Sequence, residues 1–323
     1  MVRFGVIATG TIAHKFASTA PLVDEMELAA VASRTIEKAQ AFADEFGIPK
    51  AYGSYEELFA DPDIDAVYIA TPHPFHKPCA LAAIAAGKHV LCEKPLTLTR
   101  ADSAEVYEAA RERGVFLMEA MWTRFIPTIL AAKDWIREGR IGEVRLVQAA
   151  FGYNTKYFKS DDMIYNKALD GGALFDVGVY CIEASLDFLE GHAVTDVSGF
   201  ARLTPSGVDA VNAFLLRFDN GALANLSSAV MCDQENDGVI CGEKGRIRLY
   251  PKFYAPEYAE LVVDEQVVEK VRCEFTSGFE FEIRHMIEKI EAGAITSDRI
   301  QPADTLACAE IFDKLMADGF VGK

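Results

Sequence analysis

The feature that most constrains this chain is the alternation of short apolar runs with longer helical patterns over its first 120 residues. Runs that are apolar on both faces and separated by helices pair in parallel, because each crossover passes over the sheet in a right-handed sense. We therefore predict a doubly wound α/β domain. Its strands are predicted at 2–8, 28–33, 66–70, 89–92 and 115–118, and its helices at 12–20, 34–46, 55–60, 78–86 and 100–113.

The pattern changes after about residue 124. From 194 to 275 apolar and polar residues alternate, as in strands with one buried face, and Asp219-Asn220-Gly221 supplies the positive φ of a tight hairpin. We predict a Rossmann domain at 1–121, followed at 122–323 by an α+β domain with a large, mostly antiparallel open sheet and helices on one face. Further turns are predicted at Glu243-Lys244-Gly245 and Asp264-Glu265, and helices at 128–138, 178–189, 281–291 and 303–317.

The overall charge argues against nucleic acid as a partner. Asp and Glu number 49 against 32 Lys and Arg, which leaves a formal charge of -17 that repels phosphate backbones and anionic membranes. The seven cysteines include no C-x-x-C pair, so we interpret them as reduced thiols. The chain opens on a strand pattern without a signal peptide, and no apolar run approaches the roughly 18 residues of a membrane span, so we predict a cytoplasmic protein.

The first predicted strand runs into Ala8-Thr9-Gly10-Thr11-Ile12-Ala13, a G-x-G-x-x-G/A motif with alanine in place of the first glycine. A strand before this motif and a helix after it turn backbone N–H groups toward a pyrophosphate. We predict dinucleotide binding here through Ala8, Gly10, Thr11 and Ile12. The alternative is an ordinary strand-to-helix turn in which small residues only allow close packing.

The residues after the second predicted strand favour NADP over NAD. An NAD site would place a carboxylate there, on the ribose 2′-hydroxyl. This chain instead has Ser33-Arg34-Thr35, with Lys38 one helical turn beyond Arg34. A guanidinium and an ammonium beside hydroxyl groups suit a 2′-phosphate better than a free diol. The alternative is a solvated helix start, although cations there oppose the helix dipole.

Three further segments carry candidate chemistry. Thr71-Pro72-His73-Pro74-Phe75-His76 follows the strand predicted at 66–70, and Glu93-Lys94-Pro95 follows the strand at 89–92. Both segments therefore lie at the carboxyl edge of the sheet, beside the expected nicotinamide. The third segment is Gly171-Gly172-Ala173-Leu174-Phe175-Asp176-Val177-Gly178-Val179-Tyr180, in which Asp176 and Tyr180 are four residues apart and share one face of a helix.

Oxidation of an alcohol by hydride transfer needs a base for the hydroxyl proton, and Tyr180 is a candidate. Its reference pKa is about 10, so work near neutral pH needs a shift of about 3 units, or about 4 kcal/mol. An ammonium about 4 Å away supplies about 1 kcal/mol in bulk water and about 4 kcal/mol at an effective dielectric constant of about 20. Lys94 is therefore sufficient only in a cleft that is closed to water.

Each of these residues also has an ordinary structural interpretation. Lys94 precedes a proline and could be a solvated loop residue, and Tyr180 could belong to the core face of an amphipathic helix. His73 and His76 could ligate a metal, but no third ligand stands at a recognisable spacing, so no metal site is predicted.

Taken together, these segments resemble the Gfo/Idh/MocA oxidoreductase family over the whole chain. The resemblance is carried by the turn at Gly10, by Asp176-Val177-Gly178-Val179-Tyr180 and by longer stretches, which are more specific than a glycine turn. These stretches are IPKAYGSYEEL at 48–58, VLCEKP at 90–95, FLMEAMWTRF at 116–125 and GGALFD at 171–176.

The resemblance implies a Rossmann domain, a second domain whose open sheet forms a homodimer interface, and a substrate cleft between the two domains. It implies that Lys94 holds the substrate hydroxyl and the nicotinamide, that Tyr180 is the acid or base, and that Asp176 orients the substrate or the tyrosine. The other implied residues are, for the cofactor, Thr71, Pro72, His73, His76, Glu93, Trp122 and Arg124, and for the substrate, Trp122, Phe151 and Phe275.

The function that the resemblance implies is NADP-dependent hydride transfer between a ring hydroxyl and nicotinamide C4. The substrate would be a small polyhydroxylated ring, either a sugar such as D-xylose or a trans-dihydrodiol. One alternative is a dehydrogenase or reductase for another sugar, an inositol or a keto-sugar, because the fold does not fix the substrate. Another is a regulator that binds the dinucleotide without catalysis, against which the presence of Lys94, Asp176 and Tyr180 together argues.

Overall fold

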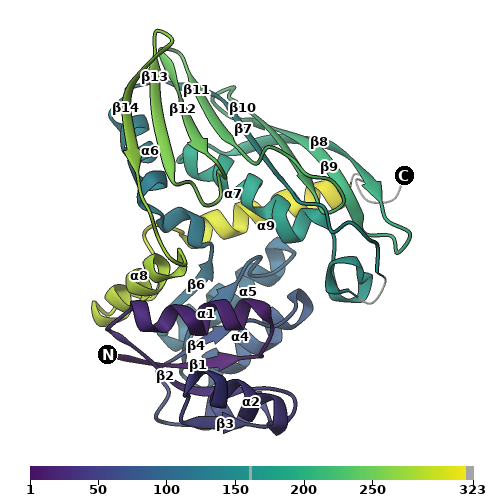
Figure 1. Cartoon of the computed structure of the whole chain (residues 1–323), viewed down its shortest axis with the longest axis vertical. Coiled ribbons are helices and arrows are strands. Elements are labelled where there is room, and N and C mark those ends of the chain that lie inside the picture. The colour runs from purple at the N-terminus through teal and green to yellow at the C-terminus, as the bar shows by residue number, and fades with distance from the viewer. Residues whose placement is uncertain (160–161, 318–323) are drawn as a thin grey trace. The chain divides into compact units, whose positions relative to one another are not determined.

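The computed structural model describes residues 1–159 and 162–317, and the chain divides into two compact units (Figure 1). The first unit combines Met1–Trp122 with Ser277–Thr305, and the second combines Thr123–Thr276 with the segment that starts at Leu306. The sequence division at residue 121 did not anticipate that a late segment returns to the first unit. Backbone and side-chain hydrogen bonds tie it there, including Leu117 N–H to Ile295 O at 3.1 Å and the Thr19 and Ser277 hydroxyls at 2.6 Å.

The first unit contains a parallel six-stranded sheet in the order β3-β2-β1-β4-β5-β6, which confirms the doubly wound prediction. The strand at Lys50–Tyr52 was not predicted, because three half-buried residues make no apolar run. The last strand starts two residues later than expected, since Val115 N–H closes the preceding helix on Ala110 O. The strands are β1 (Val2–Ile7), β2 (Met26–Ala32), β3 (Lys50–Tyr52), β4 (Ala66–Ile69), β5 (His89–Glu93) and β6 (Leu117–Ala120).

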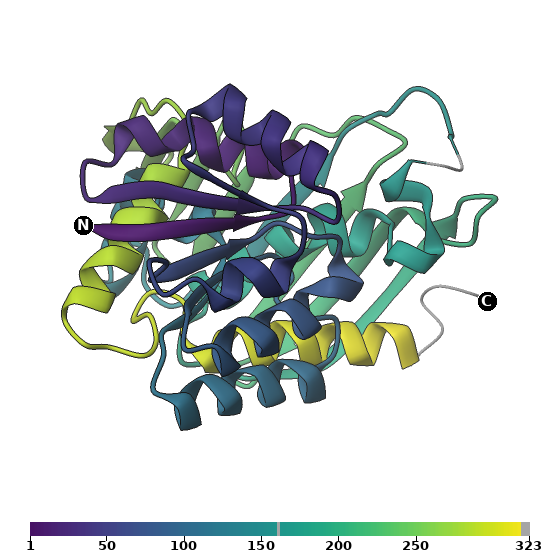
Figure 2. The same ribbon diagram turned by 90° about the horizontal axis from the view of Figure 1, so that it is seen from below.

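Helices cover both faces of this sheet, as Figure 2 shows, with α1 and α2 on one side and α4 and α5 on the other. Ser54 and Thr99 cap their helices by accepting a backbone N–H, and Gly47 and Gly114 end theirs with positive φ. These caps explain why the predicted helix bounds were accurate. The helices of the first unit are α1 (Thr11–Thr19), α2 (Ile36–Phe46), α3 (Tyr55–Ala60), α4 (His76–Ala85), α5 (Arg100–Arg113) and α8 (Phe279–Glu291).

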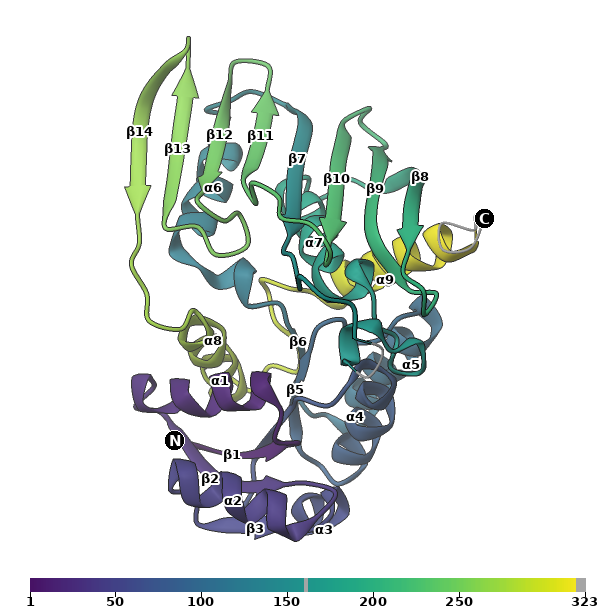
Figure 3. The same cartoon turned by 45° about the vertical axis from the view of Figure 1, so that its right-hand side comes forward.

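The second unit contains an eight-stranded sheet in the order β14-β13-β12-β11-β7-β10-β9-β8 (Figure 3). Every neighbouring pair is antiparallel except β7 and β10, so the prediction of a mostly antiparallel sheet is confirmed. The strands are β7 (Val144–Gly152), β8 (Val194–Leu203), β9 (Asp209–Phe218), β10 (Leu223–Ala229), β11 (Gly238–Gly242), β12 (Gly245–Tyr250), β13 (Tyr258–Val263) and β14 (Gln266–Arg272).

The three predicted turns each connect antiparallel strands. Gly221 has a φ of +83° in the β9–β10 hairpin, and both Asp264 and Glu265 adopt positive φ between β13 and β14. Helices α6 (Pro127–Arg137) and α7 (Val179–Phe188) pack on one face of the sheet, and α9 (Pro302–Ala317) closes the described chain. No helix within residues 1–159 and 162–317 is long and apolar enough to cross a membrane.

Candidate active site

The predicted phosphate-binding turn has the geometry of a glycine turn although it starts with alanine. Ala8 has a φ of +79°, and its N–H donates to Ala32 O at 2.9 Å, which fixes the end of β1 against β2. A left-handed conformation costs a residue with a Cβ about 1–2 kcal/mol. The turn after β1 therefore keeps the conformation of a glycine turn, and the backbone of Ala8 is strained by it.

The first turn of α1 is open to an anion. Its N-cap is Gly10, which contributes no side-chain hydrogen bond, and no acidic residue lies in the first turn. A Cβ built on Gly10 would meet no atom within 4 Å, so the space in front of the helix is open. Free N–H groups and a positive helix end favour a phosphate at this position.

The two cations predicted for the 2′-phosphate stand at the end of β2 and the start of α2. Arg34 and Lys38 are exposed, and no ion pair or hydrogen bond of either side chain occurs among the described residues. Their neighbour Ser33 is buried and donates its N–H to Tyr52 O at 3.2 Å. Thr35 begins α2 without a side-chain hydrogen bond to the helix, so its hydroxyl is not used as a cap.

His76 holds together the two loops at the carboxyl edge of the sheet. Its Nδ1 lies 2.8 Å from Pro95 O and its Nε2 lies 2.8 Å from Thr71 O. The ring is buried, and burial lowers its pKa. Both ring nitrogens are therefore engaged by the backbone, and His76 can serve a cofactor only by shaping the loops that carry Thr71 and Pro95.

Glu93 is buried directly beneath Lys94. The Tyr68 hydroxyl donates to the Glu93 carboxylate, and the Lys94 N–H donates to Glu93 Oε2 at 3.3 Å. Burial raises the pKa of Glu93, and the Lys94 charge opposes that rise. Lys94 itself is partly exposed at the end of β5, where it can reach a ligand on this edge of the sheet.

An aromatic pair encloses a lysine next to this edge. The Lys15 ammonium lies 4.2 Å from the centre of the Trp122 ring and 4.0 Å from that of Phe279. Burial lowers the pKa of Lys15, and Glu282, Glu93 and Glu280 oppose the effect. Glu282 is fully buried with no hydrogen-bond partner for either oxygen among the described residues, and burial raises its pKa well above the usual range. Trp122, the predicted wall of the nicotinamide end, is thus held in the first unit by a cation.

The second unit places Tyr180 in an aromatic cluster. Tyr180 lies at the start of α7 and is 8% exposed, with its ring centre 5.5 Å from Phe151 and 5.9 Å from Tyr254. Phe151 and Tyr254 stack face to face at 3.7 Å. Phe151, which was predicted to contact the substrate, thus lies beside Tyr180. Tyr254 was not predicted, because it lies in an irregular loop without a periodic pattern.

Asp176 lies in a π-helical turn, Leu174–Gly178, instead of the regular helix assumed from its spacing to Tyr180. Its Oδ2 accepts a hydrogen bond from the Tyr153 hydroxyl at 2.8 Å. Burial and the Asp176 charge raise the pKa of Tyr153, so this phenol stays protonated and donating. The hydrogen bond from Tyr153 therefore fixes the orientation of the Asp176 carboxylate.

Arg124 and Phe275 lie outside these groupings. Arg124 is buried in ion pairs with Glu183 at 2.7 Å and Asp187 at 3.3 Å, which gives it a structural role, and we do not include it in the proposed cofactor site. Phe275 borders a surface pocket together with Pro251, Lys252, Ala255, Glu257 and Glu274.

Lys94 belongs to the first unit and Tyr180 to the second, so the approach of their side chains is part of the proposal below. Within the described ranges, no group of three or more His, Cys, Asp or Glu is arranged to hold a metal ion. Lys15 and Glu282 were missed by the sequence analysis. Lys15 could have been noticed as a lysine on the otherwise apolar face of α1. Glu282 could not, because its role depends on the return of α8 to the first unit.

Two family models match the chain. The model described as an oxidoreductase family with an NAD-binding Rossmann fold matches residues 2–121, and the GFO/IDH/MocA C-terminal domain model matches residues 129–248. Among curated proteins, trans-1,2-dihydrobenzene-1,2-diol dehydrogenase of Mus musculus is 34% identical over 97% of this chain and 95% of its own length. The Xenopus laevis protein of the same name is 35% identical over 97% of both chains.

Solved structures are similar over nearly the whole chain. A 3-ketoreductase from Actinomadura kijaniata, in complex with NADP and TDP-benzene, is 28% identical with a TM-score of 0.87, covering 98% of this chain and 97% of its own. An aldose-aldose oxidoreductase from Caulobacter crescentus, complexed with glycerol, is 26% identical with a TM-score of 0.87, covering 98% and 96%.

Proposed function

Since this chain belongs to the GFO/IDH/MocA oxidoreductase family, we propose that it is an NADP-dependent dehydrogenase acting on a hydroxyl of a small polyhydroxylated ring. The substrate is a trans-dihydrodiol or a sugar such as D-xylose. Tyr180 is the acid or base, Lys94 is its cationic partner, and Asp176 orients the reacting groups.

The observation that carries this proposal is the setting of Tyr180. Its phenol is nearly buried beside the stacked Phe151 and Tyr254 rings, and Asp176 on the preceding turn is held by Tyr153. Aromatic faces suit the apolar face of a ring, and a carboxylate suits its hydroxyl groups. A ring that carries hydroxyls therefore matches both sides of this arrangement.

The residues of the first unit fit an NADP molecule. The open first turn of α1 suits the pyrophosphate, and the unpaired cations Arg34 and Lys38 suit a 2′-phosphate. Thr71, Pro72 and His73 at the end of β4, and Trp122 held by Lys15, are proposed to line the nicotinamide side. When bound, the dinucleotide supplies the hydride acceptor.

The protein's own residues manage the proton. In the oxidative direction Tyr180 accepts the proton of the substrate hydroxyl as the C–H bond breaks, and the Lys94 ammonium stabilises the resulting phenolate. In the reductive direction Tyr180 returns that proton to the forming alkoxide. The neighbouring Glu93 carboxylate favours the charged form of Lys94, because the two opposite charges attract each other.

The relatives support both substrate classes. The curated relatives are named as dehydrogenases of a trans-dihydrodiol, and the structural neighbours as a 3-ketoreductase and an aldose-aldose oxidoreductase. The aromatic pair of Phe151 and Tyr254 favours a ring with an apolar face. Another sugar, an inositol or a keto-sugar remains the alternative substrate of the same chemistry.

We also propose a homodimer formed through the face of the second sheet that α6 and α7 leave open. Phe200, Leu215 and Leu223 lie on this face on three adjacent strands and are 85%, 53% and 43% exposed. Contiguous apolar side chains of this kind are typical of an interface. A cytoplasmic location is part of the same proposal, and it is supported by the spacing of the seven cysteines, which include no C-x-x-C pair.

The test is an assay of reduced-nicotinamide absorbance with a panel of trans-dihydrodiols, aldoses, inositols and their keto forms, using NADP and NAD in parallel. We expect turnover with at least one cyclic diol or aldose, and a preference for NADP that Arg34→Ser reverses toward NAD. Glu37→Ser, on the same helix start, is the matched control and should leave the preference unchanged. Tight NADP binding without turnover across the panel would favour the regulator instead.

A further inference from the structure

The π-helical turn that carries Asp176 rests on a buried carboxylate from a different part of the chain. Asp209 opens β9 and is 3% exposed. Its Oδ2 accepts the Leu174 N–H at 2.8 Å, at the first residue of the turn, and the Asn212 side-chain amide at 2.6 Å. The carboxylate therefore caps the start of this helix from outside.

Ser228 in turn fixes the orientation of the Asn212 side-chain amide. Asn212 Oδ1 accepts the backbone N–H of Ser228 at 3.1 Å and its hydroxyl at 2.8 Å, across the β9–β10 pair. The amide can therefore present only its NH2 group to Asp209. We call Asp209, Asn212 and Ser228 the Asp209 network.

Two glycines let the helical segment lie directly on this network. A Cβ on Gly172, which has a φ of +119°, would lie 2.2 Å from Asp209 Oδ1. A Cβ on Gly178 would lie 2.8 Å from Ser228 Oγ. The backbone just before the turn, at Gly172, and at its last residue, Gly178, thus lies too close to the Asp209 network to carry a side chain.

The π-helical turn determines how Asp176 is presented relative to Tyr180. Such a turn inserts one residue into a helix and changes the direction of the side chains around it, and such turns are frequent at functional sites. The turn survives here because Leu174 N–H, which an α-helix start leaves without a partner, finds an acceptor in Asp209.

We propose that the Asp209 network is a positioning device for the reaction, with Asp209 as the residue that holds Asp176 and Tyr180 in their working arrangement. This inference rests on the proposed function, since it assigns Asp209 to the same reaction. A carboxylate suits this place better than an amide, because Asp209 Oδ2 already accepts two hydrogen bonds and the Ala173 backbone N–H also donates to this side chain. An asparagine would offer one acceptor oxygen and turn its own N–H groups toward the remaining donor.

The experiment compares Asp209→Asn with Asp219→Asn, a matched control. Asp219 accepts the Ala193 N–H at 3.2 Å at the exposed end of the same strand pair. For Asp209→Asn we expect kcat to fall about 10–100-fold, with the dissociation constant of NADPH unchanged. Backbone hydrogen exchange should accelerate in peptides covering 171–180 and not in the parallel sheet. The control should behave as the wild type in all three measurements.

A double-mutant cycle keeps the test independent of the stability of Asp209→Asn. Gly178→Ala should lower kcat because its methyl group meets Ser228 Oγ, and adding Ser228→Ala should restore much of it. Such a rescue would show that the close approach of Gly178 to Ser228 sets kcat, since the Ser228 backbone N–H still holds Asn212 Oδ1 in the double variant. Unchanged kcat and unchanged exchange at 171–180 in Asp209→Asn would overturn the inference.

The exchange measurement also separates this inference from the proposed function. If the wild type turns over no substrate of the panel, the proposed function fails while faster exchange at 171–180 in Asp209→Asn still supports the positioning of the turn. If turnover is present but exchange at 171–180 does not respond, the inference fails and the proposed function stands.

Discussion

The two units bury charge in opposite ways. In the second unit Arg124 and Lys133 meet Glu183 and Asp187, each charge within ion-pair distance of an opposite one. We call these four residues the Arg124 cluster. In the first unit the Lys15 cluster, which consists of Lys15, Glu93 and Glu282, places one ammonium between aromatic rings near two buried carboxyl groups.

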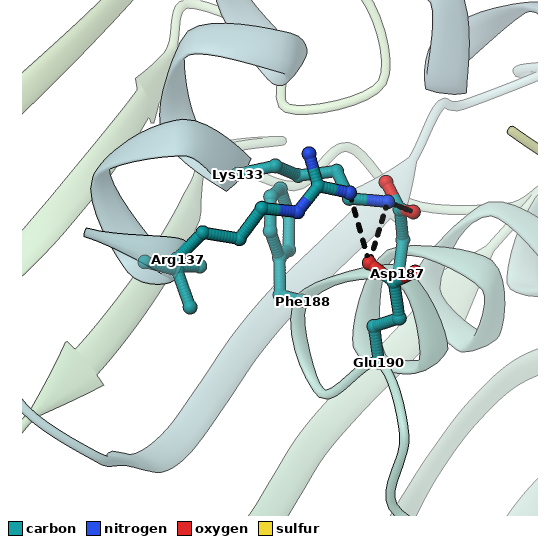
Figure 4. A pocket seen from close by; sticks show the side chains of 6 residues that line it. Lys133, Arg137, Asp187, Phe188 and Glu190 are labelled. Atoms are coloured by element: carbon teal, nitrogen blue, oxygen red, sulfur yellow. Dashed lines mark hydrogen bonds and ion pairs between the residues drawn. The ribbon is translucent and has the colours of Figure 1, made fainter. Parts of the chain in front are cut away.

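Every charge of the Arg124 cluster has an opposite charge within ion-pair distance, including at the edge of the cluster near the surface. Figure 4 shows the pocket at its rim, where Lys133 and Arg137 approach Glu190 at 3.4 Å and 3.1 Å. Phe188 lines the same pocket. Because each cation already faces a carboxylate, this pocket offers a ligand no free charge, and we assign the cluster to the scaffold that joins α6 and α7.

In the Lys15 cluster neither oxygen of Glu282 has a hydrogen-bond partner among the described residues, and the cluster adjoins the residues proposed to receive the nicotinamide. Glu93 lies directly before Lys94, and Trp122 is one wall around the Lys15 ammonium. The comparison teaches that ion pairing on every side fixes the buried side chains. A single ammonium near two buried carboxyl groups instead leaves Glu282 without a hydrogen-bond partner, so its protonation depends on pH. The following variants test that difference.

The largest expected effect is that of Arg124→Met. Removing the guanidinium leaves Glu183 and Asp187 buried with a single cation, and breaking a buried pair in this way costs about 3–5 kcal/mol of unfolding free energy. Urea denaturation measures the loss. Arg145→Met, which removes an exposed ion pair with Glu243, is the control and should unfold as the wild type does. Equal stability of the two variants would mean that the Arg124 cluster is not the scaffold described here.

Lys15→Met is expected to have a smaller effect on stability and a distinct optical one. The loss of a desolvated cation–π contact costs about 1–2 kcal/mol. The chain has two tryptophans, so in a Trp135→Phe background the emission of Trp122 can be followed alone. We expect that emission to change with Lys15→Met. An emission spectrum identical to that of the Trp135→Phe protein would show that the ammonium does not contact the ring in solution.

Glu282→Gln is expected to have the smallest effect of the three at low pH, where both side chains are uncharged, and a characteristic pH dependence above it. The raised pKa of Glu282 in the folded protein means that its contribution to stability is present at low pH and is lost as pH rises toward that pKa. Glutamine removes this dependence. Glu282→Gln should therefore gain stability relative to the wild type progressively as pH rises above about 4.5, as measured by denaturation from low to neutral pH. A constant difference across the range would contradict a protonated Glu282.

The fold followed from the sequence because its signals are local. Each signal lies within a few residues of the strand or helix end that it determines. Examples are the apolar runs of β1, β2, β4 and β5 and the helix caps at Ser54 and Gly114. The placement of α8 in the first unit could not be predicted, since an amphipathic helix does not say which surface it covers. The strand β3 was missed because its pairing with β2, and not its own composition, makes it a strand.

The candidate site was predictable by residue type more than by conformation. The motif at Gly10, the cations at Arg34 and Lys38 and the segment ending at Tyr180 were all identified from their order along the chain. The spacing between Asp176 and Tyr180 suggested a regular helix, and the structure has a π-helical turn instead. That turn depends on hydrogen bonds to Asp209, a residue 35 positions after Leu174, which no local pattern reveals.

The central claim is that Tyr180 exchanges the proton in the reaction, and Tyr180→Phe tests it most directly. The measurement is kcat for NADP reduction with the best substrate of the panel, together with the dissociation constant of NADPH. Tyr157→Phe, which removes a hydroxyl from a side chain that is 73% exposed, serves as the control. We predict that kcat falls by about 10²–10⁴ in Tyr180→Phe while NADPH binding and the control are unchanged. Turnover near that of the wild type in Tyr180→Phe would contradict the account.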